Sequence, residues 1–357
     1  MRAALFHNTG DETAEVRDDI ETVATGPGLV KVAIKATGVC HTDISSMNGT
    51  IPQPAPCVLG HEGAGEVVEV GEGVTNVSLG DHVIVSWVPP CGTCVDCLHG
   101  RPHLCMTGFI TGGPRFLLGD TPVYGVAHTG TFAEQLVIPA EAAVKIADDV
   151  PWDIASLLGC GVMTGVGAAI NTAQVRPGSS VVVFGCGGVG ISVIQGARIA
   201  GAAEIVAVDL VEGKREHAKQ FGATHTASPD ELPLVSAEIT KGAGFDYAFE
   251  VVGVPETIRA AYDAARRGGT AVIVGAGRAD KTIELNAFEL FFMEKRLLGS
   301  LYGSADVRVD FDRLLRLWRA GRLDLEGMIS QRVGLGDVNK ALADMKKGDV
   351  IRTVIEI

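Results

Sequence analysis

Residues 181–190 read VVVFGCGGVG, and this segment decides the fold of the chain. The apolar run Val181–Phe184 is typical of a buried strand, and residues 189–200 have the pattern of a helix. Between them stands a GxGxxG loop, whose glycines allow the backbone to approach a pyrophosphate at the helix N-terminus. We therefore assign Gly185, Gly187, Gly188 and Gly190 to a dinucleotide-binding loop.

An acidic residue follows at the distance that such a loop requires. Asp209 ends the apolar run Val206–Val208, about 20 residues after the loop. Its carboxylate would accept hydrogen bonds from the adenosine ribose and repel a 2′-phosphate, which favours NAD over NADP. An aspartate in an ordinary strand-end turn would look the same. Lys214, one helical turn later, is either a second ribose ligand or a solvated helix lysine.

The rest of residues 162–301 repeats this alternation of strand and helix. Buried-strand patterns recur at 205–208, 247–252, 271–274 and 297–301, and helix-length segments separate most of them. This order is typical of a parallel sheet with crossover helices. The sequence predicts a Rossmann domain over 162–301, with Val274 among its cofactor-binding residues.

The residues on either side of this domain show a different pattern of apolar residues. Up to about residue 160, short β patterns such as Val30–Ile34 and His82–Val85, with many Gly and Pro residues, indicate an irregular antiparallel barrel. Residues 302–357 offer an amphipathic helix at Asp310–Ala320 and a strand at Thr353–Ile357, which is too little for a domain. We expect one barrel domain built from 1–161 and 302–357.

Within the barrel part, residues 91–105 carry four cysteines at short intervals. The spacing of Cys91, Cys94, Cys97 and Cys105 allows four thiolates to converge on one tetrahedral zinc ion. Four protein ligands leave no position for a substrate. The pattern predicts a structural zinc lobe.

Three more zinc donors lie on widely separated segments. Cys40, His61 and Cys160 would supply two thiolates and one imidazole, which leaves the fourth zinc position open, as catalysis needs. Zinc bound in this way lowers the pKa of a water or alcohol in that position. Taken singly, each of these residues would more often be a buried core residue. Together with the lobe and the nucleotide loop, they indicate a catalytic zinc site.

Three neighbours of these donors have candidate roles. Thr42 carries a hydroxyl that is placed to accept the proton of an alcohol, although a turn threonine would fit the same pattern. Asp43 is a candidate to orient His61 through a hydrogen bond to its second ring nitrogen. Glu62, next to His61, would tune the zinc or transiently replace a ligand. Both carboxylates also suit a purely structural role.

Composition narrows the class of partner and the compartment. The chain has 46% hydrophobic and 20% charged residues. Its formal charge of −13 disfavours nucleic acid or an anionic membrane as partner, because both favour basic surfaces. Residues 177–197 carry few ionisable groups, but their glycines indicate a buried strand, turn and helix rather than a membrane span. No signal peptide is visible, and Cys57 and Cys186 are left for packing rather than for disulfides. We expect a cytoplasmic protein.

The motifs at 40–43, 60–62, 91–105, 158–165 and 185–190 resemble, in order and spacing, the zinc-dependent medium-chain alcohol dehydrogenases of the liver-type and bacterial branch. The resemblance runs from about residue 25 to the C-terminus. It implies an α/β fold in which a GroES-like β-barrel catalytic domain is joined to a doubly wound Rossmann sheet. It also implies NAD and two zinc ions per chain.

Further residues are carried over from the family. The resemblance places His41 and Arg352 against the cofactor pyrophosphate, and Thr164 and Val189 beside the nicotinamide. It places Trp87 and Tyr302 at the wall of the substrate pocket.

Two positions depart from family patterns. Ser45 stands where liver-type members complete a proton relay with histidine, so the outer relay must differ. Phe109 stands where the glutathione-dependent formaldehyde branch has an arginine, which disfavours a glutathione adduct as substrate.

The function that the sequence favours is reversible oxidation of a primary alcohol, aromatic or medium-chain, to its aldehyde with hydride transfer to NAD. The alternative is a nicotinoprotein that keeps its NAD(H) bound and uses another electron acceptor. A non-catalytic NAD-binding protein and a zinc-free quinone reductase are disfavoured, because neither needs the zinc ligands. Residues 288–301 read as a strand-bearing interface, so we expect a homodimer, with a tetramer as the alternative.

Overall fold

A computed structural model describes residues 1–107, 112–348 and 350–357. The chain separates into two compact units. The first contains Met1–Gly161, Asp306–Arg316 and Leu325–Ile357, and the second contains Val162–Ala305 and Leu317–Asp324. Our sequence prediction had placed all of 302–357 in the first domain. The structure groups part of it with the second unit, where the Gln195 amide donates to the Asp324 carbonyl (3.0 Å) and accepts from the Asp324 N–H (2.8 Å).

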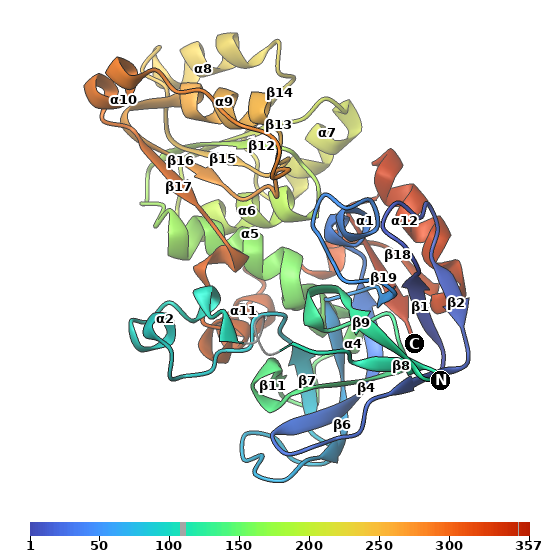
Figure 1. The fold of residues 1–357 in the computed structure, drawn as a ribbon. Coiled ribbons are helices and arrows are strands. Elements are labelled where there is room, and N and C mark those ends of the chain that lie inside the picture. Colours follow the sequence, from blue (N-terminus) through green and yellow to red (C-terminus); the bar gives the residue numbers. More distant parts are fainter. Residues whose placement is uncertain (108–111, 349) are drawn as a thin grey trace. The chain divides into compact units, whose positions relative to one another are not determined.

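The first unit is built on two β-sheets (Figure 1). One has the order β2-β1-β5-β9-β8-β3, and the other has the order β11-β7-β6-β4-β19-β18, with β10 also paired to β4. The strands of the first sheet are β1 (Ala3–Phe6), β2 (Glu15–Arg17), β3 (Ile20–Thr22), β5 (Cys57–Val58), β8 (Phe116–Leu118) and β9 (Thr121–Gly125). Those of the second are β4 (Leu29–Gly38), β6 (Gly63–Val70), β7 (His82–Val85), β10 (Gln135–Pro139), β11 (Ala143–Lys145), β18 (Ile329–Gly334) and β19 (Arg352–Glu356).

Strand β4 shows why the barrel part folds as it does. Its residues alternate between buried and half-buried, with Val30, Val32 and Ile34 pointing into an apolar core. The expectation of an antiparallel barrel was incomplete, because β5 pairs with β9 and β18 pairs with β19 in parallel. The parallel pairing of β18 and β19 is possible because helix α12 (Val338–Lys347) lies between them in the chain and provides a crossover.

The second unit contains a wholly parallel sheet with the order β14-β13-β12-β15-β16-β17. In Figure 1, α8 and α9 lie on one side of this sheet and α5 and α6 on the other, the doubly wound arrangement of a Rossmann fold. Its strands are β12 (Ser180–Phe184), β13 (Glu204–Val208), β14 (His225–Ala227), β15 (Phe245–Glu250), β16 (Ala265–Ile273) and β17 (Arg296–Gly299). Its helices are α5 (Met163–Gly167), α6 (Gly188–Ile199), α7 (Glu212–Gln220), α8 (Leu232–Thr240), α9 (Pro255–Ala264) and α10 (Ala287–Met293).

The remaining helices are α1 (His41–Met47), α2 (Val95–Leu98), α4 (Trp152–Leu157) and α11 (Val307–Arg319). One continuous helical segment, Trp152–Thr172, has the length and apolarity of a membrane span, but 89% of its most apolar window is buried inside the protein. It is therefore a core helix. Residues 177–197 contain strand β12 and most of helix α6, which confirms the strand, turn and helix expected for this apolar stretch.

Candidate metal and cofactor sites

A buried cluster brings together Cys40, His61, Glu62 and Cys160. One candidate ligand atom from each lies within 4.8 Å of all the others, and the four residues are at most 8% exposed. Cys40 caps the N-terminus of α1, His61 and Glu62 lie between β5 and β6, and Cys160 lies in a helix. Three segments far apart in the sequence thus supply the three donors that the sequence had paired with an open zinc position.

The backbone around Cys160 departs from a regular α-helix. Residues Leu158–Val162 form a π-helical segment between α4 and α5. Such segments insert a residue into a helix and are common at functional sites. Gly161, directly after the thiol, donates its N–H to Glu62 Oε1 at 3.1 Å. A Cβ atom on Gly159 would lie 3.1 Å from the Glu62 backbone, so glycine permits this close approach.

Asp43 holds two of the donor segments in place. Its carboxylate is fully buried and accepts hydrogen bonds from the Cys40 N–H (3.0 Å) and the Gly60 N–H (2.9 Å). Asp43 Oδ1 also lies 3.4 Å from His61 Nδ1. Among the described residues, neither ring nitrogen of the buried His61 has a hydrogen-bond partner. A buried imidazole in this state fits a metal ligand, because coordination would satisfy the nitrogen that the carboxylate does not face.

The electrostatics of the cluster also fit a cation. The hydrogen bond with Cys160 lowers the pKa of the Cys40 thiol well below its usual value, and the nearby His61 adds to this effect. Burial lowers the pKa of His61, but the Asp43 carboxylate and the Cys40 thiolate outweigh burial and raise it to about 10. The pocket therefore favours positive charge beside a thiolate, which is what a divalent zinc ion supplies.

A buried ion pair adjoins the cluster. Arg352 forms an ion pair with Glu62, and both side chains are almost fully buried. Gly38 leaves room for this pair, because a Cβ atom there would collide with the Glu62 carboxylate. Burial lowers the pKa of Arg352. The family resemblance places Arg352 on the pyrophosphate, and that role stays a prediction. The pairing itself was missed, since nothing in the spacing of residues 62 and 352 indicates it.

The second cluster is the lobe of Cys91, Cys94, Cys97 and Cys105, whose sulfur atoms also lie within 4.8 Å of one another. Backbone N–H groups point at these sulfurs, including those of Cys94 to Cys91 Sγ (3.3 Å) and Cys97 to Cys94 Sγ (3.5 Å). A hydrogen bond from Thr107 and others from Thr93 lower the pKa of the Cys91 thiol to about 5. Four convergent sulfurs with N–H donors fit a closed zinc site.

Other predicted residues of the first unit lie around these clusters. His41 is exposed and Thr42 is half-buried in the first turn of α1, directly after Cys40. Ser45, in the same helix, is 8% exposed. Trp87 is half-buried and lines a pocket. Phe109 lies outside the described residues.

The dinucleotide loop has the geometry that its glycines predict. Gly185 has φ of +101°, a backbone conformation that disfavours a side chain, and a Cβ atom on Gly190 would collide with the Gly185 carbonyl. Gly187 caps α6, and a Cβ atom there would meet no protein atom within 4 Å. The space beside Gly187 at the N-terminus of α6 therefore suits a pyrophosphate.

Asp209 follows β13 and faces the loop. Its two carboxylate oxygens accept hydrogen bonds from the N–H groups of Cys186 and Val211, each at 2.9 Å. Lys214 is half-buried in α7, and Arg215 donates to the Asp209 carbonyl at 2.8 Å. Sequence reasoning passed over Arg215, although it stands next to Lys214 and on the same helix.

The remaining predicted residues of the second unit lie in α5, in α6 and in the segments that follow β16 and β17. Thr164 is half-buried in α5, Val189 is half-buried in the first turn of α6, and Val274 donates its N–H to the Glu250 carbonyl at 2.8 Å. Tyr302 is 2% exposed and has φ of +52°. Sequence reasoning missed Glu250, whose buried Oε1 accepts from the N–H groups of residues 252 (2.8 Å) and 253 (2.7 Å) and so shapes the loop after β15.

Known proteins match both parts of the chain. A family model described as the alcohol dehydrogenase GroES-like domain matches residues 26–148, and one described as zinc-binding dehydrogenase matches residues 188–319. The chain is 40% identical to the NDMA-dependent alcohol dehydrogenase of Amycolatopsis methanolica, over 99% of this chain and 98% of that protein.

Two further matches extend over nearly the whole length. An S-(hydroxymethyl)glutathione dehydrogenase of Paracoccus denitrificans is 38% identical, over 99% of each chain. The crystal structure of benzyl alcohol dehydrogenase from Acinetobacter calcoaceticus has a TM-score of 0.91 and 32% identity, and the match covers 100% of this chain and 99% of that one. With its open three-donor cluster and nucleotide loop, this chain belongs to the zinc-dependent medium-chain alcohol dehydrogenase family of oxidoreductases, which use zinc and a nicotinamide cofactor.

Proposed function

We propose that this enzyme oxidises a primary alcohol, aromatic or medium-chain, to the aldehyde and transfers the hydride to NAD. The observation that carries the proposal is the buried cluster of Cys40, His61 and Cys160, three donors suited to a zinc ion with one open position. When bound there, zinc supplies Lewis acidity towards the alcohol oxygen. The residues of the chain orient the donors, exclude water and, through Thr42, accept a proton.

The preference for NAD over NADP rests on Asp209. Both of its oxygens are held by backbone N–H groups, which fixes a negative charge where a 2′-phosphate would have to lie. We expect Asp209→Ser to raise the ratio of kcat/KM for NADP to that for NAD by about tenfold or more, since each 1.4 kcal/mol corresponds to a factor of ten. An unchanged ratio would sink this assignment.

A substrate panel tests the reaction. Zinc-loaded enzyme should reduce added NAD with benzyl alcohol and with linear primary alcohols, and kcat/KM across the panel should identify the preferred class. Absence of NADH formation with every alcohol and of NADH oxidation with every aldehyde would contradict the proposal.

A second candidate function comes from one relative. The relative from Amycolatopsis methanolica is named as an NDMA-dependent alcohol dehydrogenase. Because NDMA would serve as an electron acceptor other than free NAD, this similarity favours the nicotinoprotein alternative for this chain. Under that alternative, the purified protein would contain about one NAD(H) per chain, turn over with NDMA and ignore added NAD. Cofactor extraction followed by chromatography, together with assays in both acceptors, separates the two functions.

Metal content and assembly are part of the same proposal. Two clusters of donors support two zinc ions per chain. A homodimer is supported by α10, where Phe288 and Phe291 are 67% and 79% exposed, and by strand β17, which pairs only with β16 in the described part of the chain. Light scattering should give twice the chain mass, and Phe291→Glu should lower it. We place the enzyme in the cytoplasm, with small alcohols and aldehydes rather than nucleic acid or membranes as partners.

A further inference from the structure

Two buried threonines are hydrogen-bonded to each other near the open zinc site, and the proposed reaction uses neither of them. The hydroxyl oxygens of Thr37 and Thr131 lie 2.7 Å apart, and both residues are fully buried. In the part of the chain that the structure describes, neither hydroxyl has another hydrogen-bond partner. Because burial removes water from both groups, each hydroxyl depends on the other for its hydrogen bond.

This bond joins the segments that carry two of the three zinc donors. Thr37 lies in β4, three residues before Cys40. Thr131 donates its backbone N–H to the carbonyl of Gly60 at 2.9 Å, and Gly60 directly precedes His61. A continuous path of contacts therefore runs from the strand that leads to Cys40, through the two hydroxyls, to the His61 segment.

Two glycines that flank the ligand His61 leave the room that Thr131 occupies. A Cβ atom on Gly60 would lie 2.6 Å from Thr131 Oγ1, and one on Gly63 would lie 2.7 Å from Thr131 Cγ2. Gly63 is also the cross-strand partner of Thr37 in the pairing of β4 with β6. The absence of a side chain on Gly63 therefore lets the two hydroxyls meet.

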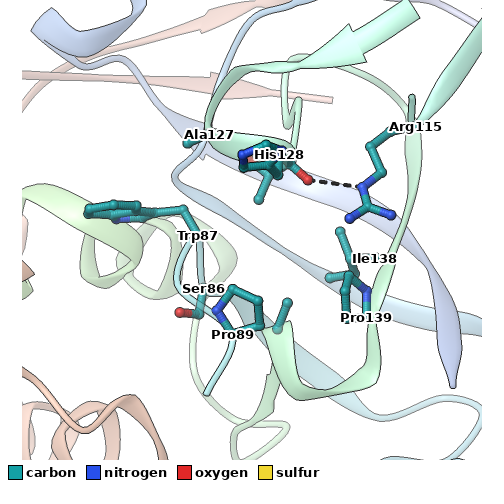
Figure 2. A pocket seen from close by; sticks show the side chains of 10 residues that line it. Ser86, Trp87, Pro89, Arg115, Ala127, His128, Ile138 and Pro139 are labelled. Atoms are coloured by element: carbon teal, nitrogen blue, oxygen red, sulfur yellow. Dashed lines mark hydrogen bonds between the residues drawn. The ribbon is translucent and has the colours of Figure 1, made fainter. Parts of the chain in front are cut away.

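The turn before Thr131 has a backbone conformation that side chains rarely adopt. Ala127 and His128 have φ of +51° and +62°. Residues other than glycine keep such angles only where the surrounding structure holds them. Arg115 supplies one such contact, since its Nε–H donates to the His128 carbonyl at 3.1 Å, as Figure 2 shows. These contacts fix the backbone from which Thr131 reaches its two partners.

The peptide groups on both sides of Gly60 are held. Its N–H donates to Asp43 Oδ1 at 2.9 Å, and its carbonyl accepts from Thr131. Asp43 also accepts from the Cys40 N–H, so the two donor segments are tied together once through Asp43 and once through the threonine pair. Metal donors bind tightly only where their supporting contacts hold them within about 0.5 Å of the required geometry.

We propose that Thr131 is a positioning residue for the open zinc site. Through its hydroxyl bond to Thr37 and its N–H bond to Gly60, it fixes the spacing between the segments of Cys40 and His61. This inference rests on the zinc ion of the proposed function and not on the identity of the alcohol.

Thr131→Val keeps the shape of the side chain and removes the hydroxyl, so it tests the bond itself. We expect the open site to bind zinc about 3- to 10-fold more weakly, a smaller loss than for a direct partner of a ligand, because the effect passes through the backbone. Chelator competition measures this affinity. The lobe zinc, identified as the ion that remains in Cys40→Ser, serves as the internal reference. Thr131→Ser keeps the hydroxyl, and its zinc affinity should stay within about twofold of the wild-type value.

Cobalt in place of zinc separates positioning from stability. The visible absorption of Co²⁺ reports the geometry and the thiolate ligands of its site. We expect the bands of the open site to shift in Thr131→Val and to return to their wild-type positions in Thr131→Ser. The matched control is Thr270→Val, which removes a hydroxyl from a buried threonine in β16 of the second unit. It should change neither the zinc affinity nor the cobalt spectrum.

The partner threonine gives an independent version of the test. Thr37→Val removes the same bond from its other end and should weaken zinc binding to a similar degree. The double variant Thr37→Val/Thr131→Val leaves no unpaired hydroxyl, so its loss should stay close to that of one single variant rather than multiply. If Thr131→Val does not fold, Thr37→Val is compared with the wild-type enzyme in its place.

Two results would overturn the proposal. One is wild-type zinc affinity and an unchanged cobalt spectrum in the folded valine variant, with only a lower melting temperature, because the bond would then serve stability alone. The other is a larger loss in Thr131→Ser than in Thr131→Val, which would assign the effect to the methyl group that packs against Gly63. An enzyme whose open-site zinc depends on Thr131 but which oxidises no alcohol would refute the proposed function alone.

Discussion

The two cysteine clusters of this enzyme hold their donor atoms in opposite surroundings. In the lobe, four thiols come from one short segment, and Cys91 and Cys94 are partly exposed. The backbone N–H groups that donate to Cys91 Sγ and Cys94 Sγ come from residues three positions later in the sequence. In the other cluster, Cys40, His61 and Cys160 come from three segments, all buried, and the Glu62 carboxylate joins them.

The surroundings decide what each cluster does. The lobe cluster contains four thiols and no carboxylate among the described residues, and four thiolates would close the coordination sphere of a zinc ion. The other cluster is held by Asp43 and adjoins the Glu62–Arg352 ion pair, so several charges depend on one another in a dry environment. A zinc ion would stabilise a local fold in the first case and a reacting alcohol in the second.

The sharpest separation should come from Cys40→Ser. Loss of one donor at the open site should lower kcat by at least about 10³-fold, because the Lewis acid is lost or displaced. NAD binding, measured by fluorescence titration, and the melting temperature should change little. Cys57→Ala, a buried cysteine outside both clusters, should keep its activity. Comparable activity in both variants would break the distinction between the two clusters.

A proton acceptor should be needed at only one cluster. Thr42→Ala should lower kcat by roughly 10²–10⁴-fold, the usual range for one proton-transfer group, and Thr42→Ser should retain most activity because only the hydroxyl is needed. Steady-state kinetics across pH measure both. Ser45→Ala should have little effect, and a large loss there with a mild one in Thr42→Ala would relocate the relay.

The lobe should respond in stability rather than in chemistry. Cys94→Ser should lower the melting temperature by roughly 5–15 °C, because a structural zinc contributes its binding free energy to folding and each kcal/mol is worth about 2–4 °C. Zinc content measured by mass spectrometry should fall from two ions to one. Full stability with one zinc lost would contradict a structural role.

Side chains that contact the donor residues should affect zinc affinity more at the buried cluster than at the lobe. Asp43→Ala leaves two backbone N–H groups without their acceptor and removes the carboxylate that lies 3.4 Å from His61 Nδ1, so zinc affinity at the open site should fall by about 10- to 100-fold. Thr93→Ala removes only a 3.6 Å hydroxyl contact to Cys91 Sγ, and lobe affinity should fall by about 2- to 10-fold. Chelator competition measures both, and equal losses would erase the contrast.

Much of this architecture could be predicted from the sequence, because strong local rules apply. The nucleotide loop was recognisable since Gly185 and Gly190 meet backbone constraints that few other residues satisfy. The lobe was recognisable because its four cysteines are close in sequence. Strand β14, only three residues long with His225 and Thr226, carries no periodic signal and was missed.

Long-range polar contacts were beyond sequence reasoning. The pairing of Glu62 with Arg352 joins residues almost 300 positions apart, and no periodicity connects them. The grouping of Leu317–Asp324 with the second unit was not visible in the sequence, because it involves side-chain contacts from α6, such as those of Gln195 with Asp324 and of Arg198 with the Arg322 carbonyl.

The π-helical segment at Leu158–Val162 has a consequence for how this enzyme can lose its site. A π-turn holds one residue more than an α-turn, and each residue of an α-helix advances the side-chain direction by about 100°. Deletion of one residue here would let the helix become regular and would turn the Cys160 sulfur away from Cys40 and His61. All the zinc ligands would still be present in the sequence, but their side chains could no longer converge on one metal ion. Loss of a single residue from this helix would therefore abolish the dehydrogenase activity, although the sequence would still resemble that of the active enzyme.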